Sequence, residues 1–246
     1  MLFGTVGCNA PTEGKTMLQL VPEWLIYIFV VLAIVGIVYL ITSWFDRKRT
    51  EALTAASQQI GFLFVGTQWK DVPQPPSVQT SLFTRGRSKQ FRNIMSGSVG
   101  GFRTFLFDYR YTVGSGRSSH TYNQTVAAYC KNGAQLPDFF LAGQGALHKL
   151  WDKVKHKDIS FDSNPEFANR FMLQSADADR TRVVFTPSLL SYLETLDGNR
   201  KVQLEGMGDT LIIYRGGKKA KPEMVKDFLD ETAAIAGQFF SLGNCK

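Results

Sequence analysis

The chain has 246 residues, of which 44% are hydrophobic, 13% aromatic and 20% charged, and its formal net charge is +7. This composition excludes an intrinsically disordered chain, because such chains have more charge and fewer aromatic residues. With 22 Gly and three Cys, it also excludes collagen-like proteins and disulfide scaffolds. The length is enough for one large domain or two small ones with a sizeable core.

The apolar residues are concentrated in one block near the N-terminus. Trp24 to Phe45 form a run of 22 residues without a charge, WLIYIFVVLAIVGIVYLITSWF. As a helix this run would be about 33 Å long, and the hydrocarbon core of a bilayer is about 30 Å thick. A cleaved signal peptide would have a basic segment before a shorter apolar run. We therefore expect a short tail over 1–21 and a transmembrane helix over 22–45.

The basic residues around this block indicate its orientation. Three of them, at positions 47–49, follow the span directly, whereas only Lys15 precedes it. By the positive-inside rule, the C-terminal part is expected in the cytoplasm and the tail outside. Residues 46–246 carry 27 Lys and Arg against 19 Asp and Glu. This positive balance suits a domain that is tethered at a negatively charged membrane surface.

Aromatic and basic side chains at the two ends of the block are expected at the membrane interface, where rings and cations meet the lipid headgroups. These membrane-interface residues are Trp24, Tyr27, Tyr39, Trp44, Arg47, Lys48 and Arg49. The lipid bilayer is thus an expected partner, and anionic lipid is a candidate ligand of the basic cluster.

The segment after the span predicts a helix that leads into a cytoplasmic domain. Residues 46–60 contain many helix formers and no Gly or Pro, so a juxtamembrane helix is expected over 46–60, until Gly61. The domain over 61–246 mixes strand and helix patterns without strict βαβ alternation. The predicted class is therefore α+β, with a mainly antiparallel sheet flanked by helices.

Strand patterns within the domain predict two hairpins. Residues 102–111 and 122–130 are rich in β-branched and aromatic residues, and turn residues separate them. Residues 201–215 form a second candidate hairpin that turns around Gly206–Gly208. The run RTRVVF at 180–185 predicts one more strand.

Three segments have helix patterns. Residues 144–157 carry apolar side chains at i, i+3, i+4 and i+7, which predicts an amphipathic helix. In the next segment, Thr186 is a candidate N-cap and Pro187 suits the first turn of a helix that ends at Gly198. The third helix is expected from Pro222 to about residue 242, after a basic loop.

The run Gly114 to His120, GSGRSSH, is the segment most typical of an enzyme. Its glycines would permit a tight turn, and Arg117 with three serines would suit a phosphate. Phosphate loops, however, connect a strand to a helix, and this run is expected to connect two strands. A hairpin loop is the favoured interpretation, ahead of a loop that contacts a partner and a phosphate site.

The sequence predicts no catalytic, cofactor or metal site. His148 and His156 are eight residues apart, which is not the i, i+4 spacing of a helical metal site. The three cysteines are far apart and have no CxxC spacing. No segment combines a nucleophile, a base and oxyanion donors.

Basic residues form separate clusters outside the span. A dense run at 85–92 is typical of a solvated face, but its closeness to the span also makes it a candidate contact for an acidic partner. The candidate partner-contact residues are Arg85, Arg87, Arg92 and Arg117. We do not expect nucleic acid as a partner, because the clusters are separated and no RNA-binding motif accompanies them.

Three phrases in the domain resemble an uncharacterised family of bacterial membrane-anchored proteins: LFDYRYTVGSGRSSHTYNQTVAAY, LPDFFL and DISFDSNPEFANRF. Members of this family have an N-terminal span, then a domain with an FDY strand, a QTV strand and a PxF motif. The resemblance covers roughly residues 50–240 and implies a bacterial inner-membrane setting. It implies no catalytic residue.

Together these features predict a non-enzymatic accessory or structural subunit, or a scaffold, of a larger bacterial inner-membrane complex. The cytoplasmic domain would dock on other subunits of the complex, for which respiratory and photosynthetic assemblies are candidates. Two alternatives stay open. One is a membrane-tethered enzyme that uses the 114–120 loop, and the other is a domain that senses anionic lipid through its basic patches.

Overall fold

The computed structural model describes residues 22–72, 79–144, 157–161, 163–196 and 202–241. The chain divides into two compact units, one up to Arg49 and one from Thr50 onward. Three predicted segments therefore lie outside the described residues, entirely or for the most part: the tail 1–21, the Pro-rich stretch after residue 72, and the amphipathic helix at 144–157.

Helix α1 (Glu23–Gln59) is continuous through the apolar block and the segment that follows it. It begins after Pro22, whose carbonyl accepts a hydrogen bond from the Leu25 amide. It ends where Gly61 adopts a positive φ of 71°, and the Phe62 amide then donates to the Ser57 carbonyl at 2.7 Å. A glycine in this conformation is a common stop signal for a helix, because other residues are strained there.

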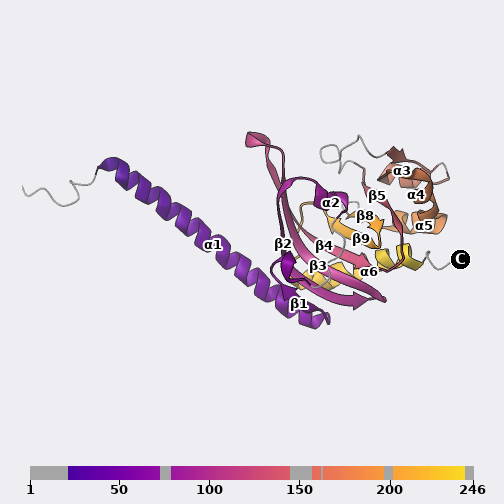
Figure 1. The fold of residues 1–246 in the computed structure, drawn as a ribbon, viewed down its shortest axis with the longest axis horizontal. Helices are drawn as coiled ribbons and strands as arrows, with labels where there is room; N and C mark the ends of the chain where they lie inside the picture. The colour runs from indigo at the N-terminus through magenta and orange to yellow at the C-terminus, as the bar shows by residue number, and fades with distance from the viewer. Residues whose placement is uncertain (1–21, 73–78, 145–156, 162, 197–201, 242–246) are drawn as a thin grey trace, which may run out of the picture. The chain divides into compact units, whose positions relative to one another are not determined.

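The second unit is built on one sheet of nine described strands (Figure 1), which supports the antiparallel α+β prediction. Every pair of neighbouring strands within the described residues is antiparallel. Their order is β1-β2-β3-β4-β9-β8-β5-β7-β6. The strands are β1 (Leu63–Gly66), β2 (Arg87–Val99), β3 (Phe102–Val113), β4 (His120–Cys130), β5 (Leu136–Gly143), β6 (Lys157–Ile159), β7 (Phe171–Ser175), β8 (Val202–Gly208) and β9 (Thr210–Arg215).

Both predicted hairpins are confirmed. Strands β3 and β4 pair in an unbroken register from Arg103 opposite Cys130 to Val113 opposite His120. Strands β8 and β9 pair around a turn at Gly208, whose φ is 57°. β4 then pairs with β9, so the two hairpins form the centre of the sheet.

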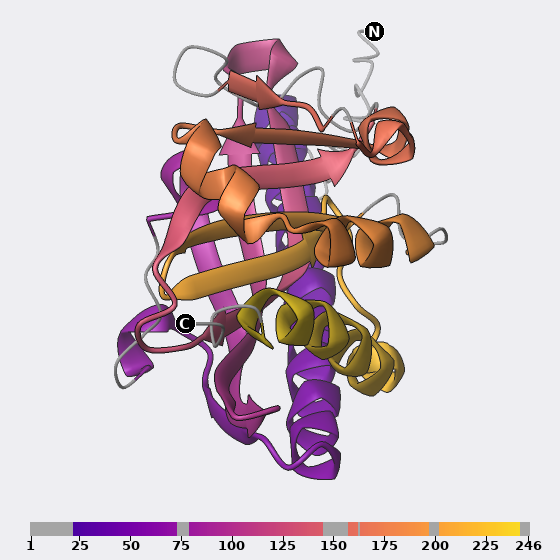
Figure 2. The same ribbon diagram turned by 90° about the vertical axis from the view of Figure 1, so that its right-hand side faces the viewer.

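Helices and an apolar core cover one face of the sheet, which we call the helical face. Figure 2 shows α5 and α6 in front of the strands. Their apolar side chains join one cluster with alternate strand residues such as Leu106, Leu211 and Ile213. Leu53 of α1 belongs to the same cluster. The helices after the first are α2 (Ser81–Thr84), α3 (Pro165–Arg170), α4 (Ala178–Val184), α5 (Pro187–Thr195) and α6 (Val225–Ser241).

The opposite face of the sheet is rich in aromatic rings, and we call it the aromatic face. Strand β3 places Phe105, Phe107, Tyr109 and Tyr111 on this face, because every second residue of a strand points the same way. Trp69 of η2 (Trp69–Asp71) and Phe83 of α2 pack against these rings. Both faces of the sheet centre are thus buried, which explains the unbroken apolar runs at 105–107 of β3 and 211–214 of β9.

The predicted strand at 180–185 is wrong, because this segment is helix α4. The Asp177 side chain accepts a hydrogen bond from the Arg180 amide at 3.1 Å and so caps the helix. Val183, which the strand pattern would have buried, is 76% exposed. The helix at 187–195 is confirmed, including its cap: the Leu189 amide donates to Thr186 Oγ1.

Candidate functional site

Almost all side chains of the apolar block of α1 are exposed. From Trp24 to Phe45, all side chains are exposed except Leu25 and Ser43, which are half-buried. Leu40, for example, is 67% exposed. Within the described residues, α1 is long and apolar enough to cross a membrane, with a mean hydropathy of 2.9.

The expected interface residues lie near the two ends of this block. Trp24 and Trp44 are 20 positions apart, which corresponds to about 30 Å along a helix. Both are exposed, as are Tyr27 and Tyr39. Lys48 places its ammonium nitrogen 4.2 Å from the centre of the Trp44 ring. Arg47 and Lys48 are exposed, and Arg49 is half-buried.

Arg85, one of the candidate partner-contact residues, points into the domain on the aromatic face. Its Nη2 donates to the Tyr214 hydroxyl at 2.9 Å and lies 3.6 Å from Glu205 Oε1. Only 14% of the Arg85 side chain and 1% of the Glu205 side chain are exposed. Nη2 of this guanidinium is therefore bound within the chain, and the side chain is largely buried.

Glu205 is the centre of this buried cluster. Its Oε1 accepts a 2.6 Å hydrogen bond from the Tyr214 hydroxyl. Its Oε2 accepts from Ser81 Oγ at 3.0 Å and from the Leu82 amide at 2.8 Å. One carboxylate thus fixes the start of α2 to strand β8, more than 120 positions later in the sequence.

The cluster also shifts the pKa values of Tyr214 and Arg85. Burial raises the pKa of Tyr214 well above its ordinary value, and the neighbouring Glu205 carboxylate acts in the same direction. For Arg85, burial alone would lower the pKa, but the oxygens of Tyr214 and Glu205 outweigh it, so the pKa is raised. Arg85 therefore stays charged and Tyr214 stays neutral, so the ion pair of this cluster is the one between Arg85 and Glu205.

The other candidate contact residues lie on the surface. Arg87 starts β2 opposite Thr112, close to the end of β3. Arg117 lies in the short helix η3 (Gly116–Ser118) between β3 and β4. The register therefore brings Arg87 and Arg117 to the same end of the sheet. Arg92 is also exposed but lies further along β2, opposite Asp108.

The 114–120 loop connects two antiparallel strands, as the favoured interpretation predicted. Gly114 has a φ of 78°, and a Cβ there would lie 2.6 Å from the Ser118 carbonyl oxygen. The glycine is thus needed to close the hairpin. The loop contains one short turn of 3-10 helix and leads directly into strand β4. It therefore does not have the strand-to-helix geometry of a phosphate loop.

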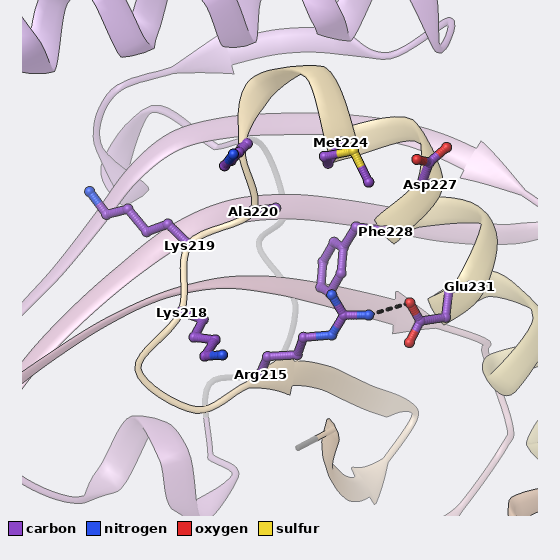
Figure 3. A pocket seen from close by; sticks show the side chains of 9 residues that line it. Arg215, Lys218, Lys219, Ala220, Met224, Asp227, Phe228 and Glu231 are labelled. Atoms are coloured by element: carbon purple, nitrogen blue, oxygen red, sulfur yellow. Dashed lines mark hydrogen bonds and ion pairs between the residues drawn. The ribbon is translucent and has the colours of Figure 1, made fainter. Parts of the chain in front are cut away.

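A concave basic surface lies elsewhere, between β9 and α6 (Figure 3), and we call it the basic pocket. Its volume is about 240 Å³. It is lined by Arg215, Lys218, Lys219, Ala220, Lys221, Met224, Asp227, Phe228 and Glu231. The sequence marks its loop only as a basic stretch before a helix. It does not indicate that Arg215 and Glu231 complete the walls.

The backbone of the pocket loop is fixed to strand β4. The Gly217 amide donates to Gln124 Oε1 at 3.0 Å, and the Ala220 amide donates to Thr125 Oγ1 at 2.9 Å. The Thr125 amide in turn donates to the Lys218 carbonyl at 3.1 Å. The lysines of the loop therefore extend from an anchored backbone.

A series of buried hydrogen bonds continues from this anchor. Thr125 Oγ1 also donates to Asp108 Oδ1 at 2.9 Å. Asp108 Oδ2 accepts from Asn93 Nδ2 at 3.0 Å, and Asn93 Oδ1 accepts from Thr50 Oγ1 at 2.8 Å. The pocket loop, strands β2 to β4 and the first residue of the second unit thus share one polar network.

In the part of the chain that the structure describes, no group of three or more His, Cys, Asp or Glu residues is placed to hold a metal ion. Cys130 is a half-buried free thiol. Burial raises the pKa of its thiol, so it is less reactive than an ordinary cysteine.

Comparison with family models and with curated protein sequences gave no match. Among solved structures, the chain is similar to the crystal structure of the mycobacterial trehalose monomycolate transport factor A, TtfA, with a TM-score of 0.56 and 13% sequence identity. The similarity covers 80% of this chain and 96% of that one. At this identity the match shows a shared fold.

Proposed function

We propose that the protein is a membrane-anchored accessory factor: α1 holds it in the bilayer, and its α+β domain binds other members of a membrane assembly. The observation that carries this proposal is the exposed apolar surface of α1 from Trp24 to Phe45. Leaving so many large apolar side chains in water is costly, at about 25 cal/mol for each Å². Insertion in lipid removes that cost.

The fold supports the accessory role in general terms. The neighbour with the same fold is named as a trehalose monomycolate transport factor. A shared fold does not transfer a substrate, so we extend only this general role to the present chain. The proposed setting is the bacterial inner membrane, with the domain in the cytoplasm as the basic residues 47–49 favour.

Anchoring is tested by extraction of cell membranes with alkaline carbonate, which removes peripheral proteins. The full chain should stay in the membrane pellet. The double variant Val31→Arg/Val38→Arg places two charges in the block and should move the chain to the soluble fraction, because each charge near the bilayer centre costs about 2.5–3.5 kcal/mol. The matched variant Val31→Leu/Val38→Leu should behave as the wild type. Release of the wild-type chain by carbonate would refute the anchor.

Partner binding is tested by placing a photo-crosslinking residue at Arg87 or Arg117 in the cell. We expect each position to crosslink to a second membrane protein, because both lie at the exposed end of the β2–β4 strands. The control position is Lys226, on the exposed side of α6, where it pairs with Asp230. Crosslinks of equal yield at all three positions would indicate random collision and would argue against a defined docking surface.

A further inference from the structure

The basic pocket carries more positive charge than its own acids neutralise. Arg215 is paired with Glu231 at 2.5 Å, and Figure 3 shows its guanidinium below the ring of Phe228. Asp227 is the other acid of the lining. In the described part of the chain, no acidic side chain forms an ion pair with Lys218, Lys219 or Lys221. Four cations and two carboxylates thus leave a local charge of about +2.

The fold sets the backbone positions of these lysines. Gly217 has a φ of 70°, which allows the tight turn after β9. Hydrogen bonds that the loop amides donate to Gln124 and Thr125 then fix the loop backbone. An anion would therefore meet cations whose main chain is already ordered, which lowers the entropy lost on binding. A solvated lysine-rich surface loop needs no such anchoring.

The rest of the lining is apolar. Ala220, Met224 and Phe228 contribute it, and Met224 is 47% exposed. The volume of about 240 Å³ is several times that of a water molecule, about 30 Å³. This is enough for a phosphate group with a small organic group attached.

From this charge, anchoring and size, we propose that the basic pocket binds a phosphate monoester group. Such a group carries a charge of about −1.5 to −2 at neutral pH, which matches the uncompensated charge of the pocket. Lysines suit it as mobile point charges. A carboxylate, with one charge, would leave the pocket half neutralised. The inference goes beyond the accessory role and does not depend on it.

The group could belong to a soluble phosphate monoester or to the headgroup of phosphatidic acid. The full chain is reconstituted in nanodiscs of phosphatidylcholine, and the acylation rate of each lysine by an amine-reactive reagent is followed by mass spectrometry. Glycerol 3-phosphate is added in one arm. In a second arm, phosphatidic acid is included in the nanodisc. Potassium chloride of equal ionic strength is the control in both.

We expect acylation of Lys218, Lys219 and Lys221 to slow severalfold in at least one arm, while Lys226 is unchanged. Lys226 is a matched control because it lies on the same helix as Phe228 but outside the pocket. Slowing in the first arm identifies a soluble ligand, and slowing in the second alone identifies the lipid headgroup. Equal slowing of Lys226, or none in either arm, would overturn the proposal.

The variant Lys218→Gln/Lys219→Gln/Lys221→Gln gives an independent check. Its affinity for the ligand that protects the lysines, glycerol 3-phosphate or phosphatidic acid, is measured by calorimetric titration of the nanodisc-reconstituted chain. Affinity should fall by roughly tenfold or more, because three partly screened charges are removed. Lys226→Gln should bind as the wild type. The circular dichroism spectrum of both variants should match the wild type, since these side chains are exposed. Unchanged affinity of the triple variant would refute the assignment of the pocket.

Discussion

The Tyr214 hydroxyl donates a 2.6 Å hydrogen bond to the Glu205 carboxylate, across the β8–β9 hairpin and inside the aromatic face. Arg85 approaches the same two groups from the segment before β2. A buried ion pair of this kind contributes little net stability, but breaking it leaves a charge without compensation. The cluster therefore determines how the segment with α2 sits on the sheet.

Glu205→Gln tests this cluster. The amide keeps the size of the side chain but removes the charge opposite Arg85, so we expect a loss of about 2–4 kcal/mol in the free energy of unfolding. In a domain of this size, that corresponds to a melting temperature lower by roughly 5–15 °C. Thermal unfolding of the full chain in mild detergent, followed by tryptophan fluorescence, measures it. Glu166→Gln, at an exposed position in α3, is the matched control, and an equal shift in both would contradict the role of Glu205.

High pH should destabilise the domain through its buried tyrosines. Burial raises the pKa of Tyr109, Tyr111, Tyr129 and Tyr214 in the folded state, while in the unfolded chain it is about 10. Above that pH the folded state binds more protons than the unfolded state. The contribution of these tyrosines to the free energy of unfolding is therefore fully present below a pH of about 10 and falls as the pH rises toward the raised pKa values. Denaturant unfolding at a series of alkaline pH values should show this slope. Stability that is constant as tyrosinate appears in the absorbance spectrum would contradict the prediction.

Thr125→Val should loosen the pocket loop. The substitution keeps the shape of the side chain but removes its hydrogen bonds to Asp108 and from the Ala220 amide. We expect a loss of about 1–3 kcal/mol in stability and faster hydrogen exchange in residues 216–221, measured by mass spectrometry. The exposed Thr195→Val is the control. If exchange of the loop is as slow as in the wild type, Thr125 does not anchor it.

Two glycines should respond to alanine in opposite directions. A Cβ at Gly206 would lie 2.2 Å from the Phe139 ring, so Gly206→Ala should destabilise the sheet by about 1–3 kcal/mol. At Gly237, within α6, nothing lies within 4 Å of the added Cβ. Gly237→Ala should stabilise the helix by up to about 1 kcal/mol. A higher melting temperature for Gly206→Ala would contradict the tight packing of Gly206 on Phe139, and a lower one for Gly237→Ala would contradict the open space at Gly237.

Sequence reasoning succeeded where local signals decide the structure. Thr186 and Pro187 specify the start of α5 by themselves, and the residues between β3 and β4 can only turn. It failed at 180–185, where two adjacent valines favour a strand but the Asp177 cap favours a helix. The cap prevailed because β7, an unpredicted strand just before it, already fills the place beside β5.

The site was less accessible to sequence reasoning, because its parts come from distant segments. Arg85 reads as one more surface cation until the fold brings Glu205 and Tyr214 beside it. Likewise, the lysines at 218–221 read as a solvated loop. Only the packing of β9 against α6 turns them into one wall of a pocket, with Arg215 and Glu231 as the other.

The most direct test of the proposed function is the mass of the particle that contains this protein after gentle detergent extraction from its own membranes. Native mass spectrometry of the affinity-purified, tagged full chain at its normal expression level gives that mass. We predict a particle heavier than the 27.5 kDa chain, with a second membrane protein in constant ratio. A single monodisperse chain without any protein partner would contradict it.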